Sequence, residues 1–167
     1  MRGIVKNNLP LSYARAMVGM YKQIAETWKR LYKEKSDILK QKIIAARREH
    51  AIVRVDKPSR LDRARALGYK AKQGFIVVRV RVSKGGMRRK RARAGRRPKH
   101  IGVVKIKQAE SMKVVAERRV AERYPNMEVK GSYYLFEDGR YYWFECILVD
   151  KAHPAVKNDR ELRHQLA

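Results

Sequence analysis

The sequence predicts an α+β fold: a small, mainly antiparallel four-stranded sheet with covering helices, an N-terminal helical arm and a long basic loop. Three observations lead to this prediction. Four short segments are rich in the β-branched and aromatic residues that favour strands. Elsewhere, apolar residues recur at the three- and four-residue spacing of helices. Residues 79–99 contain eleven Lys or Arg and no acidic residue, so they cannot bury a core of their own.

Composition sets the expected organisation. At 167 residues, of which 44% are hydrophobic, the chain is long enough for one domain with its own core. We expect an extension and helical arm in residues 1–50, an α+β core domain in 51–150 with a basic loop at 83–100, and a tail in 151–167. The net charge of +26, from 42 basic and 16 acidic residues, predicts a negatively charged partner.

The arm is expected to contain two helices. Residues 12–31 carry an apolar stripe at helical spacing, and residues 38–48 carry a second one. Ser36 or Asp37 is a candidate cap for the second helix. The sequence leaves open whether these helices rest on the sheet or on a partner. The first stripe consists of Tyr13, Met17, Met20, Ile24, Trp28 and Leu31.

The core is expected to begin with a strand over residues 51–55 and a short helix over residues 60–67. Ser59 stands three residues before Asp62, which is a capping-box arrangement. Gly68 suits the left-handed position that often follows a helix. The side of this helix that carries the arginines is expected to meet phosphate, while the apolar side packs.

Residues 74–82 give the clearest strand pattern, because their side chains alternate between two faces. Ile76, Val78, Val80 and Val82 are expected on one face, and Val77, Arg79 and Arg81 on the other. This strand leads directly into the basic loop. The loop is therefore expected to be anchored on the sheet and to become ordered on a polyanion.

Charge is strongly segregated along the chain. No acidic residue occurs from Arg63 to Ala109, whereas six precede this stretch and ten follow it. We interpret the stretch as one continuous face committed to nucleic acid. The candidate binding residues on the second strand, in the loop and beyond it are Arg79, Arg81, Lys84, Arg88, Arg89, Lys90, Arg91, Arg93, Arg96, Arg97, Lys99, Lys105 and Lys107.

The second half of the core is expected to be a helix and a hairpin. Residues 108–123 have helical spacing, and residues 127–136 and 141–149 flank an Asp-Gly turn, which is a strong hairpin signal. The aromatic residues of these strands invite comparison with sheets that stack RNA bases, but cross-strand packing pairs are the favoured interpretation. After Asp150 few large apolar residues remain, so the tail is expected to lie over the surface.

Signals for catalysis and metal binding are poor. Cys146 is the single cysteine and the four histidines lack ligand-like spacing, so neither a metal nor a cofactor is expected. No phosphate loop, dinucleotide fingerprint or hydrolase motif occurs. Glu137 and Asp138 form the closest acidic pair, and their turn position explains it. No apolar stretch reaches the length of a membrane span and no signal peptide is evident, which predicts a cytoplasmic protein in a reducing compartment.

Several motifs together resemble a known family. They are KPSRLDRARALGYKAKQGFIVVRVRVSKGG at 57–86, GRRPK at 95–99, AERRVAERYPNMEV, EDGRYYWFECILVD and HPAVKND. The combination closely resembles the archaeal and eukaryotic large-subunit ribosomal protein fifteen, "e" type, and the short chain favours an archaeal source. The resemblance implies a non-enzymatic α+β domain with a mainly antiparallel sheet, whose extended basic elements are buried in large-subunit ribosomal RNA (rRNA). It also implies that the loop from Lys84 to Lys99 contacts rRNA, together with Arg60, Arg63, Arg65, Lys70 and Lys72.

Three functions follow as hypotheses. The leading one is a structural, ribosome-bound constituent of the large subunit that braces rRNA and contacts neighbouring ribosomal proteins, with no membrane or small-molecule substrate. The second is an architectural DNA-binding protein, because the same charges would coat a duplex. The third is an RNA-processing enzyme, which is disfavoured because no catalytic cluster is apparent.

Overall fold

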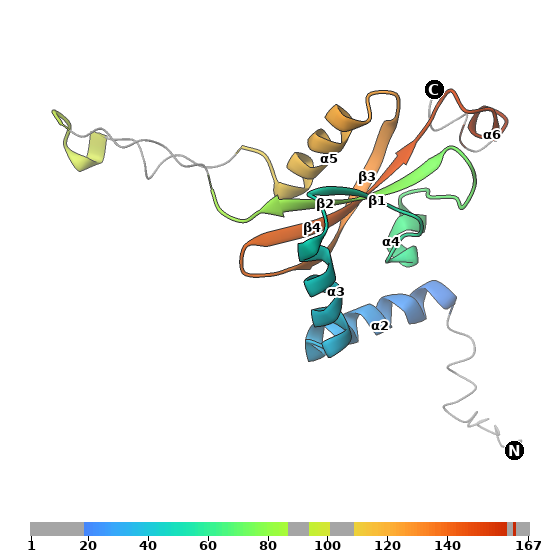
Figure 1. Cartoon of the computed structure of the whole chain (residues 1–167), viewed down its shortest axis with the longest axis horizontal. Coiled ribbons are helices and arrows are strands. Elements are labelled where there is room, and N and C mark those ends of the chain that lie inside the picture. The colour runs from blue at the N-terminus through green and yellow to red at the C-terminus, as the bar shows by residue number, and fades with distance from the viewer. Residues whose placement is uncertain (1–18, 87–93, 101–108, 160–161, 163–167) are drawn as a thin grey trace, which may run out of the picture.

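The computed structural model describes residues 19–86, 94–100, 109–159 and 162, and a four-stranded sheet forms its centre (Figure 1). Every pair of neighbouring strands runs antiparallel. The predicted α+β fold is therefore confirmed, and each strand boundary lies within one residue of its predicted position. The strand order is β1-β2-β4-β3, with β1 Ile52–Val55, β2 Phe75–Ser83, β3 Glu128–Glu137 and β4 Tyr141–Val149.

The hairpin of β3 and β4 pairs its aromatic rings across the strands. Phe136 is opposite Trp143, with ring centroids 5.3 Å apart, and Tyr134 is opposite Phe144 at 6.2 Å. Tilted and edge-on pairs at such distances add stability beyond the area they bury. The interpretation of the aromatic rings as cross-strand packing pairs is confirmed for these two pairs, whereas Tyr141 and Tyr142 contact Trp143 and Phe144 of their own strand.

Helix α5 (Met112–Arg123) covers one face of the sheet (Figure 1). The Ser111 hydroxyl caps it by accepting a hydrogen bond from the Val114 N–H at 3.3 Å. Its apolar side belongs to a buried cluster with the β2 face that the alternation predicted. The buried members of that cluster are Val78, Val80, Val82, Val115, Ala116, Val120, Phe144, Cys146 and Leu148.

Helices α2 (Met20–Glu34) and α3 (Asp37–Arg48) lie on the opposite face of the sheet (Figure 1). Their side chains Trp28, Leu39 and Ala46 are buried in one cluster with residues of all three long strands. The arm helices therefore rest on the sheet, which the sequence had left open. The Ser36 hydroxyl caps α3 as expected, accepting from the Ile38 N–H at 3.3 Å. The part of the predicted first helix that precedes residue 19 lies outside the described residues.

The short helix α4 (Leu61–Ala66) is present, but its predicted cap is wrong. Its N-cap is Arg60, without a side-chain cap hydrogen bond. The Ser59 hydroxyl instead donates to the Glu145 carboxylate on β4 at 2.6 Å, and the Ser59 N–H donates to the same carboxylate at 2.9 Å. A tertiary contact with a buried acid has replaced the local cap. The left-handed Gly68 is confirmed by its φ of 83°.

The described part of the C-terminal tail is docked on the core, contrary to the expectation that it lies over the surface. It contains the short helix α6 (Pro154–Lys157), whose first residue is a proline, a favoured position. Val156 and Leu162 are 2% and 1% exposed and join the cluster beneath the sheet. Two widely spaced apolar side chains, Val156 and Leu162, thus anchor a segment that has few large apolar residues.

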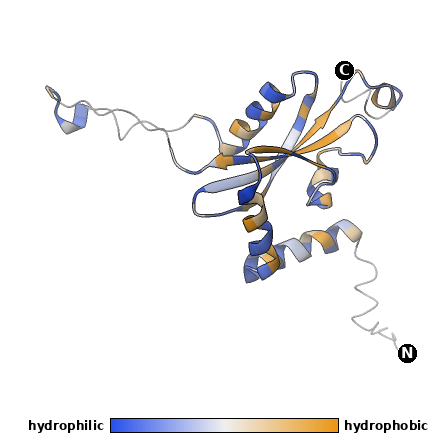
Figure 2. Cartoon of the chain, in the orientation of Figure 1, coloured by the Kyte–Doolittle hydropathy of each residue, from blue (hydrophilic) through white to orange (hydrophobic). Residues whose placement is uncertain are grey.

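Hydropathy follows the layers. Figure 2 shows apolar colouring concentrated on the strands, while the helices carry hydrophilic residues along with apolar ones. Among the helices of the described residues, none has the length and apolarity needed to cross a membrane.

Candidate nucleic-acid interface

The basic segment, residues 84–100, follows β2 and is described over residues 84–86 and 94–100. Arg96, Arg97 and Lys99 are exposed, and the last of them lies in the 3-10 helix η1 (Pro98–His100). Figure 1 shows η1 well outside the body formed by the sheet and its helices. The predicted binding residues Arg88, Arg89, Lys90, Arg91, Arg93, Lys105 and Lys107 lie outside the described residues.

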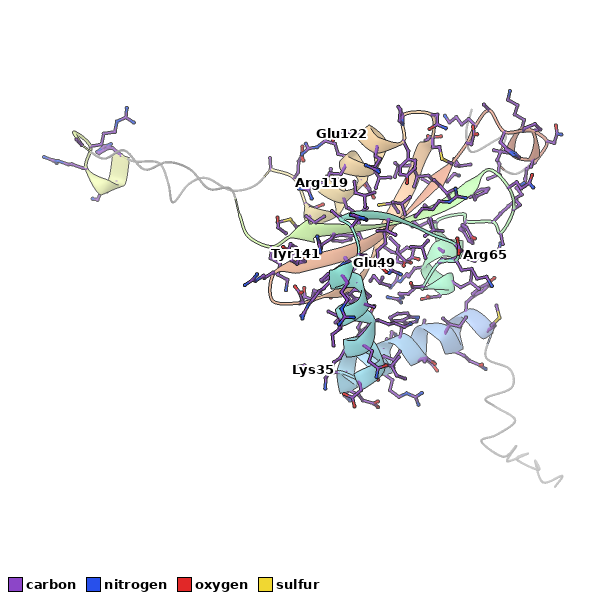
Figure 3. The ribbon with its side chains drawn as sticks, viewed as in Figure 1. Lys35, Glu49, Arg65, Arg119, Glu122 and Tyr141 are labelled. Carbon is purple, nitrogen blue, oxygen red and sulfur yellow. The ribbon has the colours of Figure 1, made fainter. Side chains whose placement is uncertain are left out.

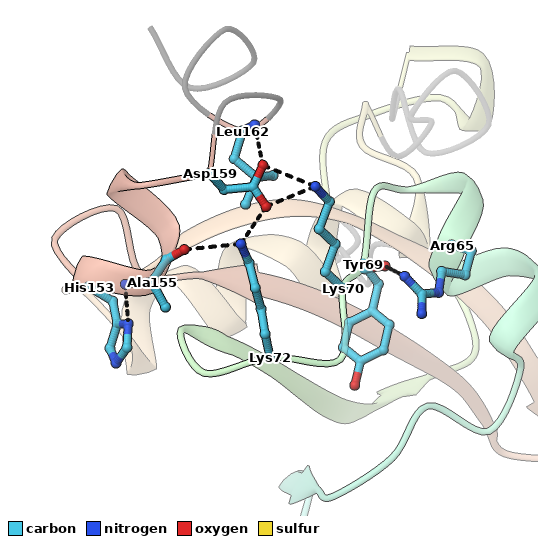
Figure 4. Close-up of polar contacts among 8 residues, drawn as sticks. All are labelled: Arg65, Tyr69, Lys70, Lys72, His153, Ala155, Asp159 and Leu162. Carbon is cyan, nitrogen blue, oxygen red and sulfur yellow. Dashed lines mark hydrogen bonds and ion pairs between the residues drawn. The ribbon is translucent and has the colours of Figure 1, made fainter.

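Helix α4 presents a second group of basic side chains. Arg63 and Arg65 are exposed, whereas Ala64 between them is completely buried. The Arg65 guanidinium donates to the Tyr69 carbonyl at 3.2 Å, which ties it to the turn after the helix (Figure 4). The predicted division of this helix into a packing side and a charged outer side is present for these residues.

Arg60 points the other way. Its side chain is 9% exposed and forms an ion pair with Asp62 at 2.9 Å. Its guanidinium carbon also lies 5.4 Å from the ring centroid of Trp28 and 5.8 Å from that of Tyr32. Such cation–π contacts are strongest where water is excluded. Arg60 is therefore a packing residue in this fold, with little surface to offer to phosphate.

Arg79 is held inside a polar network on the β2–β4 pair. Its side chain is 17% exposed and contacts Glu49 at 3.1 Å and Glu145 at 3.4 Å. Glu145 is completely buried and also accepts a hydrogen bond from the Tyr133 hydroxyl. Burial and the neighbouring Glu145 carboxylate raise the pKa of Tyr133 well above its usual value, so the phenol keeps its proton and donates. The charge of Arg79 is balanced by these two acids.

Lys70 and Lys72 are occupied by the C-terminal segment. The Asp159 carboxylate pairs with Lys70 at 2.9 Å and with Lys72, and Lys72 also donates to the Ala155 carbonyl at 3.0 Å (Figure 4). The hydrogen bonds from Lys72 and Lys70 hold the pKa of Asp159 well below its usual value. The two lysines dock the α6 segment, and their side chains are only partly exposed.

Lys84 and Arg81 lie where the basic segment leaves the sheet. Lys84 pairs with Glu137 at 3.2 Å, and its ammonium lies 4.6 Å from the Tyr142 ring centroid. Arg81 lies over the Tyr141 ring at 4.8 Å. Both cations are anchored on aromatic rings at the same end of the sheet.

Sequence reasoning missed three arginines at this end of the sheet. Arg47 from α3 and Arg140 from the hairpin turn line a cavity with Arg81, and the Arg119 guanidinium donates to the Arg81 carbonyl at 3.4 Å. Figure 3 shows Arg119 on α5 and Tyr141 at the start of β4, both near the point where the basic segment departs. All three arginines fall outside the acid-free stretch, so only the tertiary fold brings them to it.

The acidic pair of the hairpin has a structural explanation. The Asp138 carboxylate accepts the N–H groups of Arg140 and Tyr141 at 2.7 and 2.6 Å, which fixes the turn. Burial raises the pKa of the Cys146 thiol to about 12, so it is a poor nucleophile. No group of three or more potential metal ligands occurs among the described residues.

Two comparisons with known proteins agree with the resemblance. A family model described as Ribosomal L15 matches residues 19–165. The chain is also similar to the large ribosomal subunit protein eL15 of Thermoplasma volcanium. The two are 49% identical over 145 residues, which cover 86% of this chain and 74% of that protein.

Proposed function

Since this chain belongs to the ribosomal L15e family, we propose that it binds and braces large-subunit rRNA through its basic segment and the exposed arginines of α4. The family is that of a structural component of the large ribosomal subunit and not of an enzyme. The protein is thus expected on ribosomes in the cytoplasm, in contact with rRNA and with neighbouring ribosomal proteins. An RNA-processing activity is set aside, because the family is structural and the acidic pair at the hairpin is explained by its turn.

One observation supports this proposal most strongly. Arg96, Arg97 and Lys99 are exposed in a segment that reaches away from the body and lies within the acid-free stretch. Basic side chains that neutralise phosphates release counterions, which supplies affinity without reading sequence. The basic segment would therefore provide affinity, and the rigid sheet would fix the point from which it reaches into the RNA.

The candidate binding residues that the structure describes fall into an exposed group and a group that is engaged in ion pairs. Arg63, Arg65, Arg96, Arg97 and Lys99 have exposed side chains. Arg60, Arg79, Lys70 and Lys72 are engaged with acids of this chain. We propose that the exposed group contacts phosphate and that the engaged group maintains the surface from which it does so.

Salt dependence tests the proposal. A variant with Arg96, Arg97 and Lys99 replaced by Gln is compared with the unaltered chain for binding to large-subunit rRNA fragments over a range of salt concentrations. Each lost phosphate contact should flatten the slope of log K against log salt by about 0.7–0.9, so we expect a slope smaller by about two. The matched control replaces Arg54, Arg123 and Lys151, which are exposed cations spread over the body.

Two results would contradict the proposal. One is an identical salt slope for the triple variant and the unaltered chain. The other is tighter binding to duplex DNA than to structured rRNA at the same ionic strength, which would favour the architectural DNA-binding hypothesis.

A further inference from the structure

A half-open cavity of about 470 Å³ lies beside the β3–β4 turn, where α3 ends and β2 passes. Three arginines from three separate elements line it. Its volume is within the range of about 300–1,000 Å³ typical of small-molecule sites, so a group larger than a single ion fits. The lining residues are Arg47, Arg81, Asp138, Gly139, Arg140 and Tyr141.

Arg81 is fixed in place before any ligand arrives. Its backbone N–H donates to the Ala51 carbonyl at 2.8 Å, and its guanidinium donates to the Arg47 carbonyl at 3.1 Å. The guanidinium carbon also lies 4.8 Å from the centroid of the Tyr141 ring. A guanidinium held in this way loses little freedom when it binds an anion or stacks on a base.

Asp138, the acid in the lining, is neutralised within the fold. Its carboxylate pairs with the Arg47 Nε at 2.7 Å in addition to the two backbone N–H groups of the turn. Burial opposes the shift, but the hydrogen bonds from Arg140, Tyr141 and Arg47 lower the pKa of Asp138. The carboxylate thus positions Arg47, and the cavity keeps a net positive charge.

The remaining wall of the cavity is accessible. Arg140 is exposed, and apart from Gly139 and its two chain neighbours no heavy atom lies within 4 Å of the position that a Cβ on Gly139 would occupy. A ligand can therefore approach the backbone of the turn closely.

We propose that this cavity binds one unpaired nucleotide of RNA, a proposal that rests on the proposed function and adds a specific subsite to it. The phosphate is held by the guanidinium groups of Arg47, Arg81 and Arg140. The base packs against the stack of Arg81 on Tyr141, since Arg planes and aromatic rings are the surfaces on which unpaired RNA bases stack. Because Arg47 and Arg81 are held by hydrogen bonds within the fold, the cavity selects a nucleotide in one position.

Two-dimensional NMR of the full chain tests this site, with a uridine tetranucleotide and inorganic phosphate as separate probes. At about 0.15 M salt, where non-specific attraction is screened, the tetranucleotide should shift the amide signals of Gly139, Arg140 and Tyr141 saturably. Arg140→Gln should weaken this binding by about tenfold, the scale expected for a charge-assisted hydrogen bond. The control Arg123→Gln removes an exposed arginine from the end of α5 and should leave the binding unchanged.

Arg81→Lys separates stacking from charge. It keeps the positive charge but loses the planar group, so it should retain phosphate binding and lose the preference for the tetranucleotide over phosphate. Equal affinities of the unaltered chain for the two probes would overturn the nucleotide assignment, and unshifted turn amides would overturn the site. Failure of the proposed function would appear separately, as unchanged rRNA binding in the Arg96, Arg97 and Lys99 variant.

Discussion

Glu145 carries a completely buried carboxylate on β4, and both of its oxygens accept hydrogen bonds. It accepts hydrogen bonds from the Ser59 N–H, the Ser59 hydroxyl and the Tyr133 hydroxyl, and it faces Arg79. A buried acid is tolerated only when it is paired and hydrogen-bonded in this way. This single residue therefore joins β4, β2, β3 and the segment that enters α4.

Replacing Glu145 by Gln should strongly destabilise the fold. The substitution leaves Arg79 with less opposing charge and turns an acceptor into a donor beside two hydroxyl groups. Breaking a buried pair costs about 3–5 kcal/mol, which should lower the melting temperature by roughly 6–20 °C in thermal unfolding followed by circular dichroism. Glu122→Gln, on the exposed side of α5, should change stability by less than about 0.5 kcal/mol. Equal melting temperatures for the two variants would contradict this role.

Gly74 is required where the C-terminal segment meets β2. Its φ is +89°, and a Cβ there would approach the Val156 Cγ2 to 2.5 Å. Gly74→Ala should therefore cost about 1–3 kcal/mol through backbone strain and also push α6 away from the core. Denaturant unfolding measures the cost, with Gly86→Ala as the control, since Gly86 has neither a positive φ nor a close neighbour. A Gly74 variant as stable as the Gly86 variant would show that the segment accommodates the methyl group freely.

At the scale of elements, the sequence predicted what depends on local pattern and missed what depends on distant partners. Alternation and the Asp-Gly turn located the strands within one residue, because one face of each strand must be apolar. The assignment of Ser59 as a cap was wrong, because its partner Glu145 lies 86 residues away. The prediction of the candidate nucleic-acid interface was incomplete for the same reason. Charge segregation identified the basic segment, but it could not show that Arg60 and Arg79 face inward or that Arg47 joins Arg81.

The docking of the α6 segment should weaken in acid. Hydrogen bonds from Lys72 and Lys70 lower the pKa of Asp159 in the folded chain. Asp159 therefore stabilises the docking fully above its usual pKa of 3.8, and this contribution is lost as the pH falls through the lowered pKa of the folded chain. Asp159→Asn should therefore increase amide hydrogen exchange of residues 156–159 at neutral pH, whereas the unaltered chain should show such exchange only well below pH 4. The control Asp37→Asn removes an exposed Lys–Asp pair from α3 and should leave this exchange unchanged. Identical exchange in the Asp159 variant would assign docking to Val156 and Leu162 alone.

At the scale of the whole molecule, the two faces of the sheet are both covered, so the core does not need a partner to bury it. The surface, in contrast, carries a large excess of positive charge. A net charge of +26 repels itself, and this figure already counts every acidic residue that forms an ion pair within the chain. Stability should then depend on polyanions through binding to the folded state rather than through completion of the core.

Structured rRNA should consequently raise the melting temperature. A ligand present at about 100 times its Kd adds about 2.7 kcal/mol if it binds only the folded chain, which corresponds to roughly 5–11 °C for a protein of this size. Scanning calorimetry with a large-subunit rRNA fragment measures the shift, which should vanish at high salt as phosphate contacts are screened. Heparin is the control polyanion. It binds the unfolded chain as well, because the charge is the same, so it should raise the melting temperature less than rRNA does. The fold sets the positions of Arg63, Arg65 and Arg81, so it should favour an RNA of matching shape. Equal increases in melting temperature with rRNA and with heparin would mean that charge alone accounts for the binding.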